Sequence, residues 1–576
     1  RGTATVGIDF GSNNTCVYYN EDNKGATPVH FENYRSVLVG RENNDPKAIA
    51  ENNELLFFTN YSSNNGQTKS WLHEHDNRYN CYNESLEVAG GVPVNRPNVL
   101  VKKMDQYEIT TQAGILHYNM KWLDDDKGKQ KKGAFLKSIW LQTCAYLYTN
   151  KIKPTTLEWS CPGSMMEADI NELDKIYNSL CKLTPIVGAK TTLAYHQNAV
   201  TEAEAVCSYA LSQNFGLNSN NMFLGIDVGG STSDILLLAK DSDNGNQATL
   251  YRESSVRLAA GVFFNAVIKS DTFRQALLSF HEGHKTNVYL SNIKEILTEP
   301  SKAPYFLNSI FDQLKTTEDY EEFYSSIDVN AKFVFTIPAY VTGMLLYYSG
   351  MLIGKTIKAE HLERISRVDV LSFGKGGRLF HWLLNSAGVR ATREYYADCL
   401  NAGVRMVVGK ELDVVYRDEI AEDNKAEVAK GLCDPKELEK KAFSSESDIC
   451  GESGVKYIMA NGAPKELQAE DELTGDYFAN EMNNFDFSGI ENFEKFMNIF
   501  LDFVSVKTHL YPQADNALRS DLADLPNRIA SYICNNDTEY RKARNSEDGS
   551  FHYHQPLIIA EGVCFLDTLI KKVFDQ

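Results

Sequence analysis

The chain has 576 residues, with 58 lysines and arginines against 77 aspartates and glutamates, and a formal net charge of −19. A length near four times the usual domain size suggests about four folding units, and the 43% apolar share excludes a disordered or fibrous chain. The acidic balance argues against a protein that wraps nucleic acid or lies on anionic lipid, because neither surface attracts a polyanion. Eleven cysteines without a CxxC pair, and no apolar leader in the first residues, predict free thiols and a cytoplasmic protein.

The first informative segment, residues 5 to 15, reads TVGIDFGSNNT and continues into the apolar run CVYY. An apolar strand ending in aspartate, a turn of glycine and hydroxyl residues, and a second apolar strand predict a β-hairpin. Glycine lets backbone N–H groups approach phosphate oxygens. Because an aspartate repels phosphate, an aspartate in this position implies that a divalent cation lies between the two groups or that the aspartate positions a water. The tip therefore indicates a phosphate and metal site, although a plain hairpin turn also explains a single copy.

The stretch between this hairpin and residue 215 contains three further features. The strongest local basic cluster is interpreted as a solvated loop, and it consists of Lys127, Lys129, Lys131 and Lys132. Residues 159 to 162 read as the end of a strand, and Glu167 follows in the first turn of the next helix. Residues 201 to 211 read as another helix, rich in alanine and other small residues.

A second copy of the hairpin follows at residues 223 to 234, which read FLGIDVGGSTSD and continue into ILLL. Both copies share the register Gly-Ile-Asp-x-Gly, and Asp9 and Asp227 lie 218 residues apart. The repeat predicts two related lobes of about 200 residues each. Two facing tips of this design would hold a polyphosphate and its Mg²⁺ from both sides.

Two segments come next. Residues 333 to 354 carry no charge and are long enough to cross a bilayer, but a proline, hydroxyl groups and three tyrosines favour a buried helix over a membrane span. Residues 368 to 373 then read as a strand and 379 to 384 as a helix, joined by GKGGR. A glycine-rich turn from strand to helix gathers backbone N–H groups, which suits an anion or a flat base, although ordinary turns also look like this.

Taken in order, the three glycine-rich segments resemble the phosphate-1, phosphate-2 and adenosine motifs of the actin-like ATPase superfamily. This superfamily joins DnaK-type heat-shock chaperones, actin and MreB filaments, and sugar kinases, and the chain is most similar to the DnaK-like nucleotide-binding domain. Residues 201–211 and 426–432 resemble its two connecting helices, which cross closely at the hinge. The resemblance implies an α/β fold of two lobes, built from duplicated ribonuclease H-like domains with outer subdomains. We expect lobe I at 1–215, lobe II at 216–433 and a mixed helical and strand appendage at 434–576.

The resemblance also implies roles for individual residues. It places Asp9 and Asp227 around the metal and the attacking water, with Asp234 as a further metal ligand. In MreB-like proteins a glutamate at the position of Glu167 orients the hydrolytic water. The residues that would hold the phosphates are Gly11, Ser12, Asn13, Asn14, Gly229, Gly230, Ser231 and Thr232. Those at the base and ribose would be Gly374, Gly376, Gly377 and Arg378, whose planar guanidinium can stack on adenine.

The chain departs from the family pattern at three points. Lys375 stands where the chaperones have the second glycine of the adenosine motif. Glu202 and Glu204 are rivals for one position of the first connecting helix. The catalytic lysine of the chaperones has no convincing counterpart among Lys47, Lys69, Lys102 and Lys103. We therefore expect ATP hydrolysis to be slow or absent.

Residues from 434 onward lie outside the resemblance. Residues 437–447 are charged and predicted to be helical or mobile, 493–504 form an amphipathic helix, and 557–562 read as a strand and turn before a final helix. The ending resembles the tail of large bacterial SrfB-type virulence-associated proteins. Zinc binding is not expected at three histidine pairs that lack nearby cysteine or an HExxH context, namely 73/75, 281/284 and 552/554.

The leading hypothesis is a Mg²⁺-dependent ATP-binding protein and ATPase, chaperone-like, that binds ATP and ADP. Nucleotide state would open and close its lobes and act on a protein partner. A second hypothesis is a small-molecule, sugar-type kinase on the same fold, which requires a general base beside an acceptor hydroxyl. A third is a filament-forming or partner-binding scaffold with little turnover. We expect neither a nucleic acid partner nor a membrane span.

Overall fold

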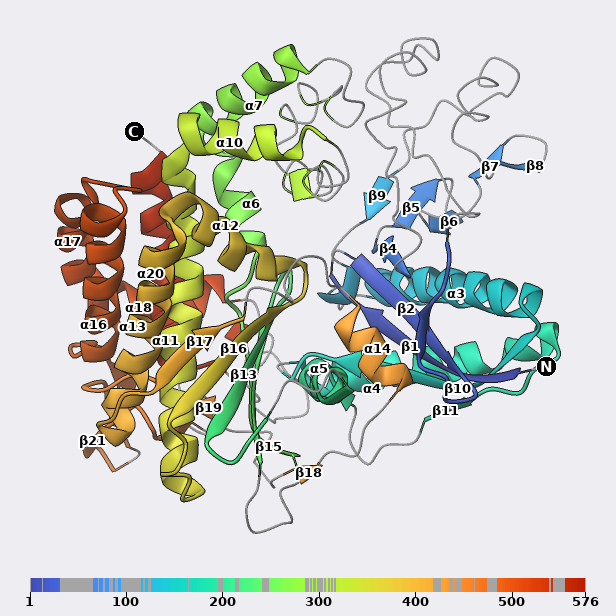
Figure 1. The fold of residues 1–576 in the computed structure, drawn as a ribbon, viewed down its shortest axis with the longest axis horizontal. Helices are drawn as coiled ribbons and strands as arrows, with labels where there is room; N and C mark the ends of the chain where they lie inside the picture. Colours follow the sequence, from blue (N-terminus) through green and yellow to red (C-terminus); the bar gives the residue numbers. More distant parts are fainter. Residues whose placement is uncertain are drawn as a thin grey trace. The chain divides into compact units, whose positions relative to one another are not determined.

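The chain folds into two compact units (Figure 1). Unit 1 comprises residues 1–213, 272–330 and 424–437, and unit 2 comprises 214–271, 331–423 and 438–576. The computed structural model describes residues 2–12, 14–31, 66–70, 72–75, 78–81, 86–88, 92–94, 115–117, 120–122, 126–163, 165–194, 200–212, 217–240, 248–284, 290, 293, 297, 304, 307–308, 311, 314, 318–417, 426–434, 439–440, 448–459, 461–473, 484–537, 540–541 and 555–574.

Unit 1 is built on a mixed sheet with the strand order β11-β10-β1-β2-β3. Strand β1 runs antiparallel to β2 and parallel to β10, and the short strands β4 and β12 pair with β2 and β10. The strands are β1 (Gly2–Phe10), β2 (Asn14–Glu21), β3 (Ala26–Pro28), β4 (Gln67–Lys69), β10 (Ile152–Cys161), β11 (Thr192–Leu193) and β12 (Val200–Thr201). The first predicted hairpin is thereby confirmed as β1 and β2.

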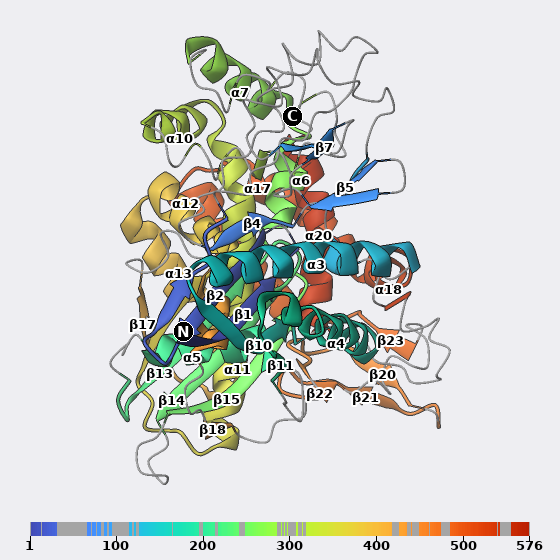
Figure 2. The same ribbon diagram turned by 90° about the vertical axis from the view of Figure 1, so that its right-hand side faces the viewer.

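Helices cover both faces of this sheet, which explains why β1 is almost continuously buried. One face packs on α3 (Asp126–Thr149) and α4 (Glu167–Cys181), and Figure 2 shows α3 crossing the strands. The other face packs on α14 (Glu427–Cys433), where a side chain on Gly7 would collide with the helix backbone. Helix α14 also crosses α5 (Glu202–Ser212) closely, because Gly431 lies against the backbone of α5. The predicted close contact between these two helices is confirmed.

Unit 2 repeats the strand order of unit 1. Its sheet runs β17-β16-β13-β14-β15-β18, with β13 antiparallel to β14 and parallel to β16. The strands are β13 (Asn221–Val228), β14 (Ser233–Lys240), β15 (Ala248–Val256), β16 (Arg367–Phe373), β17 (Asp413–Tyr416) and β18 (Glu439–Lys440). The hairpin with its third strand and two parallel neighbours therefore occurs in both sheets, and the second predicted hairpin is confirmed.

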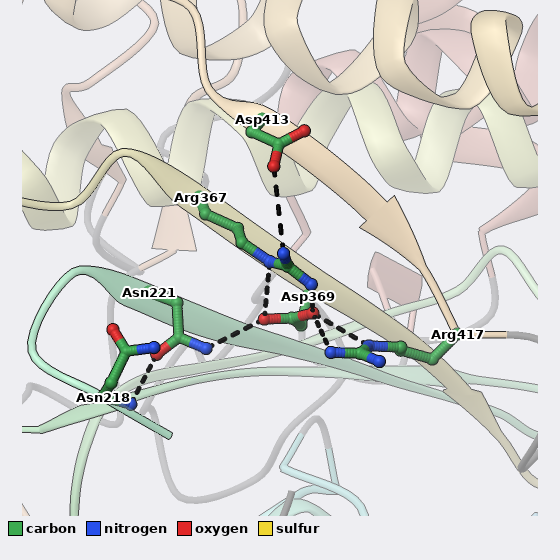
Figure 3. Close-up of polar contacts among 6 residues, drawn as sticks. All are labelled: Asn218, Asn221, Arg367, Asp369, Asp413 and Arg417. Carbon is green, nitrogen blue, oxygen red and sulfur yellow. Dashed lines mark hydrogen bonds and ion pairs between the residues drawn. The ribbon is translucent and has the colours of Figure 1, made fainter. Parts of the chain in front are cut away.

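A buried aspartate ties three strands of this sheet together (Figure 3). Asp369 on β16 is 4% exposed and accepts hydrogen bonds from Asn221 on β13 and from Arg367 at the start of its own strand. Arg417, immediately after β17, donates to it at 2.9 Å. The carboxylate thus fixes the pairing of β13, β16 and β17 near the start of these strands, at the end opposite to Asp227 and Gly374.

The uncharged segment forms α11 (Thr336–Ala359), which is buried over nearly its whole length. It is the one described helix that is long and apolar enough to cross a membrane, and its complete burial in the protein confirms a core helix, so no membrane span is indicated. Glycines allow α13 (Val389–Val408) to approach it, since a side chain on Gly350 or Gly403 would collide with the facing backbone.

The C-terminal residues complete the core of unit 2 and cover the other sides of α11. Figure 1 shows their helices beside α11 and α13, and Tyr340 of α11 donates a hydrogen bond to the carbonyl of Gly562 at 2.8 Å. The helices are α16 (Glu491–Leu501), α17 (Ala514–Asp524), α18 (Pro526–Asn536) and α20 (Leu557–Phe574). This division differs from the expected lobes, because 434–576 was expected to form an appendage and 427–433 to belong to lobe II.

Two local predictions were wrong. Residues 557–562 are the first turns of α20 rather than a strand and turn, because a short apolar run is equally compatible with a fully buried helix. The basic cluster at 127–132 lies on α3 rather than in a loop, and Lys132 is fully buried beside Glu172 of α4 at 2.9 Å.

The amphipathic helix at 493–504 is confirmed as α16 and the helical turn that continues it. Of residues 437–447, only the strand 439–440 lies in the described part.

Candidate functional site

The hairpin tip of unit 2 carries two aspartates that face each other. Asp227 ends β13 and is paired in register with Asp234 of β14, so both side chains lie on the same face of the hairpin. They are only 5% and 2% exposed. Two ionised carboxylates in this position would repel each other, and a bound cation would relieve that repulsion. Paired carboxylates completed by phosphate oxygens and water are a usual Mg²⁺ site, so these residues fit the predicted metal.

The turn between the two strands is closed by a hydrogen bond of 2.9 Å from the Gly229 N–H to the Thr232 carbonyl. The carbonyls of Gly229 and Gly230 accept hydrogen bonds from Ala260 and Gly261, at the start of α6 (Gly261–Val267). In a trans peptide the N–H points opposite to the carbonyl. The N–H groups that follow these two carbonyls, which include that of Ser231, therefore point away from α6, as a phosphate-binding turn requires.

The predicted adenosine segment packs directly on this tip. Strand β16 ends opposite Asp227, and Gly374 follows with a φ of +69°. A side chain on Gly374 would collide with the Asp227 carboxylate, and one on Gly376 would collide with the carbonyl of Val228. Lys375 lies in a 3-10 turn (Lys375–Gly377), and its backbone conformation there does not require a glycine. The lysine is therefore compatible with this turn, although the chaperones have a glycine at the same position.

Arg378 begins α12 (Arg378–Ala387) and is held by two aromatic rings. Its guanidinium lies 5.0 Å from the ring centre of Phe264 and 5.2 Å from that of Trp382. The ring centres are 6.3 Å apart, whereas rings on opposite faces of the guanidinium would be separated by about 10 Å. The two rings therefore do not lie on opposite faces of the guanidinium, and the stacking of Arg378 on a base stays a prediction.

The hairpin tip of unit 1 differs in one respect. Asp9 is fully buried at the end of β1, but the residue opposite it is Cys16 rather than a second aspartate. Ser70 fastens this tip by donating to the Gly11 carbonyl at 2.6 Å and by a hydrogen bond of 2.9 Å with the Thr15 hydroxyl. The tip in unit 1 thus carries one carboxylate, whereas the tip in unit 2 carries two.

Further polar groups surround the first tip. The indole N–H of Trp122 donates to the Ser12 hydroxyl at 3.0 Å, and Asn14 begins β2 with its side chain buried. Lys69 lies on β4 opposite Asn14 in the register of the sheet. Four predicted residues lie outside the described residues, namely Asn13, Lys47, Lys102 and Lys103.

The structure distinguishes the two rival glutamates. Glu204 forms a capping box with Thr201: each residue accepts a hydrogen bond from the backbone N–H of the other. Glu202 instead forms a buried ion pair with Lys121, which is 3% exposed and lies next to Trp122. Sequence reasoning missed Lys121, since no local pattern indicates a partner 81 positions away. The capping box could have been read directly from the T-x-x-E spacing.

Glu167 and Tyr177 lie on the same helix, α4. Glu167 is exposed in its first turn, where the helix dipole stabilises a carboxylate, and its predicted role in orienting water stays a prediction. Tyr177 is fully buried and stacks on Trp159 at 4.9 Å. Burial, and then the negative charge of Asp9, raises the pKa of this phenol well above its ordinary value. Tyr177 therefore stays protonated and offers a hydrogen-bond donor near Asp9.

Among the described residues, no three His, Cys, Asp or Glu side chains are grouped closely enough to hold a metal without other ligands. A metal at Asp227 and Asp234 would therefore take its remaining ligands from phosphate and water. A scan against protein-family models found no match to the chain, and a search of the curated proteins found none either. The resemblance to the actin-like ATPases therefore stays a prediction from the motifs.

Proposed function

We propose that the chain is a Mg²⁺-dependent ATP-binding protein with slow ATPase activity, of the DnaK-like and actin-like class. The observation that carries the proposal is the buried Asp227–Asp234 pair at a glycine turn, with the Gly374 turn packed against it. A cation would relieve the repulsion between two facing carboxylates, and Mg²⁺ in proteins commonly accompanies phosphate groups.

The repeated strand order supports the two-lobed actin-like fold of duplicated ribonuclease H-like domains. Each sheet has a hairpin, a third antiparallel strand and two parallel strands in the same positions, and each hairpin ends in the same aspartate-glycine turn. Such a match over two stretches more than 200 residues apart is difficult to explain by the requirements of a single hairpin turn.

In this proposal the residues have distinct roles. Asp227 and Asp234 hold Mg²⁺, which would supply charge neutralisation for the phosphate oxygens. The turn at 229–232 binds phosphate through its backbone N–H groups, and Arg378 stacks on the base. Asp9, at the hairpin tip of unit 1, accepts a hydrogen bond from the attacking water. Nucleotide state would then open and close the lobes and act on a protein partner.

The first test measures binding of ATP with and without Mg²⁺ by calorimetry. We expect Asp227→Asn and Asp234→Asn each to weaken Mg²⁺-dependent binding at least tenfold, because each removes a charged metal ligand. Asp413→Asn is a matched control, since Asp413 is an exposed aspartate of the same sheet. Wild-type affinity in both site variants would overturn the assignment.

The second test separates the roles proposed for the two tips. Asp9→Asn should reduce ATP turnover while leaving Mg²⁺-dependent ATP binding within a few-fold of wild type, because the metal carboxylates are in unit 2. ATP consumption in the presence of sugars and short acids distinguishes the kinase hypothesis, and sedimentation with and without ATP distinguishes the scaffold hypothesis.

A further inference from the structure

The C-terminal part of unit 2 buries two carboxyl groups that the proposed nucleotide site does not use. Glu452 follows β19 (Asp448–Ile449), and Glu561 lies in the second turn of α20. Neither residue is accessible to solvent. Since an unpaired buried carboxylate is strongly unfavourable, the groups around the two side chains decide which one carries a charge.

Glu452 is surrounded by hydrogen-bond donors that favour its ionised form. One of its oxygens accepts the backbone N–H groups of Ser453 and Asn492, each at 2.7 Å, and the other accepts that of Phe493 at 2.9 Å. Asn492 and Phe493 belong to the first turn of α16, so the carboxylate also lies at the positive end of a helix. Three such bonds stabilise the anion against the cost of burial.

The backbone places Glu561 against Glu452. The Ile558 N–H donates to the Cys450 carbonyl at 3.4 Å, and a side chain on Gly451 would collide with Ile558. Glu561 lies three residues beyond Ile558, and therefore on the same face of α20. The two carboxyl groups are close enough for each to influence the pKa of the other. Among the described residues, no N–H or O–H group donates a hydrogen bond to the Glu561 oxygens.

The remaining groups around the pair do not neutralise a second negative charge. Tyr340 and Tyr347 face it from α11, and Cys564 faces it from α20. Cys450 adjoins Glu452, Asp471 adjoins Cys450, and Arg405 of α13 acts on Tyr347. Burial raises the pKa of both glutamates, and the neighbouring Glu452 charge raises the pKa of Glu561 further.

We propose that Glu452 and Glu561 share one proton at neutral pH, and that its release loosens α20 and the start of α16 from the core helix α11. The proton resides on Glu561, whose O–H donates to the Glu452 carboxylate. Loss of the proton leaves Glu452 and Glu561 as two adjacent buried anions. Glu561 immediately precedes Gly562, whose carbonyl accepts the hydrogen bond from Tyr340. This inference is independent of the proposed nucleotide site.

The direction of the pH dependence follows from linkage. A glutamate in the unfolded chain has a pKa near 4.3, so the folded state binds the proton more tightly than the opened state does. The stabilisation is complete below that pH and is lost as the pH rises through the raised folded-state pKa. Within this window the opening equilibrium constant increases by up to about tenfold per pH unit for each proton.

Hydrogen exchange of peptides from α16 and α20, expressed as protection factors between pH 5 and pH 8, tests the proposal. Protection in the wild type should fall as the pH rises. In Glu561→Gln it should stay constant, because the amide still donates to Glu452 but does not titrate. Glu494→Gln, an exposed position of α16, should behave like the wild type. A flat wild-type profile, or an unchanged slope in Glu561→Gln, would overturn the proposal.

A second measurement does not depend on how well the variants fold. A proton shared by Glu452 and Glu561 should give the wild type a carbonyl stretch of a protonated carboxyl in its infrared spectrum at pH 7. The band should disappear in Glu561→Gln and remain in Glu494→Gln. Its absence from the folded wild type would also refute the proposal.

Discussion

At the scale of single residues, Asp369 shows how one carboxylate fastens strands that are far apart in the sequence. Burial alone would raise its pKa, but hydrogen bonds from Arg367, Asn221 and Arg417 outweigh burial and lower it. We expect Asp369→Asn to reduce the free energy of unfolding of unit 2 by about 1–3 kcal/mol at pH 7, because both arginines lose a charged acceptor. Urea unfolding followed by hydrogen exchange of β16 and β17 measures this loss.

The same residue gives a pH dependence of opposite sign to that of the glutamate pair. Since the folded-state pKa of Asp369 is lowered, its contribution is present above the unfolded-state pKa of about 3.9 and is lost as the pH falls through the folded-state pKa. The wild type should lose this contribution in acid, whereas Asp369→Asn lacks it at every pH. Asp413→Asn is the control, because Asp413 is 68% exposed and lies 4.0 Å from Arg367. Equal effects of the two variants would contradict the proposed role of Asp369.

At the scale of secondary-structure elements, the crossing of α5 and α14 depends on Gly431. Alanine is the better helix former by about 1 kcal/mol, but its Cβ at this position would collide with the backbone carbonyl of Ala205. We expect Gly431→Ala to destabilise unit 1 by about 1–3 kcal/mol, because overpacking outweighs propensity. Gly133→Ala in α3 should stabilise it by up to about 1 kcal/mol, since nothing lies within 4 Å of that position. Thermal unfolding of the two variants should therefore shift in opposite directions.

Elements with strong local patterns could be predicted from the sequence. Both hairpins combine apolar runs with a glycine turn, and α11 is a long uncharged run, so each element is specified by adjacent residues. The start of α20 was predicted as a strand because the run Leu557–Ala560 is short and wholly buried, and burial removes the periodicity that distinguishes the two structures. Pro556, which favours the first turn of a helix, was the available signal.

The candidate site was predictable only in part, for a related reason. The glycine turns and Asp227 are read within a dozen residues, whereas the ion pair of Lys121 and Glu202 depends on tertiary packing. The same holds for Lys132, whose burial beside Glu172 follows from how α3 packs on α4. A run of basic residues is therefore predicted to be exposed to solvent, because nothing in the run itself indicates which lysine is buried beside a partner.

At the scale of the whole molecule, the two units are not contiguous in the sequence. Residues 427–433 join unit 1 because Ala429 packs on Gly7 and on Cys16 of the sheet. The C-terminal helices join unit 2 because α11 would otherwise expose its aromatic side chains to water. Tyr340 alone contacts the rings of Phe496, Phe500 and Phe565. The segment expected to be an appendage is therefore a layer of the unit-2 core.

A truncated chain that ends at residue 447 tests this assignment. It retains β18 but removes α16, α17, α18 and α20, and each large apolar side chain that becomes exposed on α11 forfeits about 1.5–3 kcal/mol. Several such losses together match the 5–15 kcal/mol that stabilises a typical domain. We expect β13, β14 and α11 to lose hydrogen-exchange protection, while the described strands of unit 1 keep it and serve as the internal control. A detachable appendage would instead leave protection in both units unchanged, because its removal would uncover no core surface.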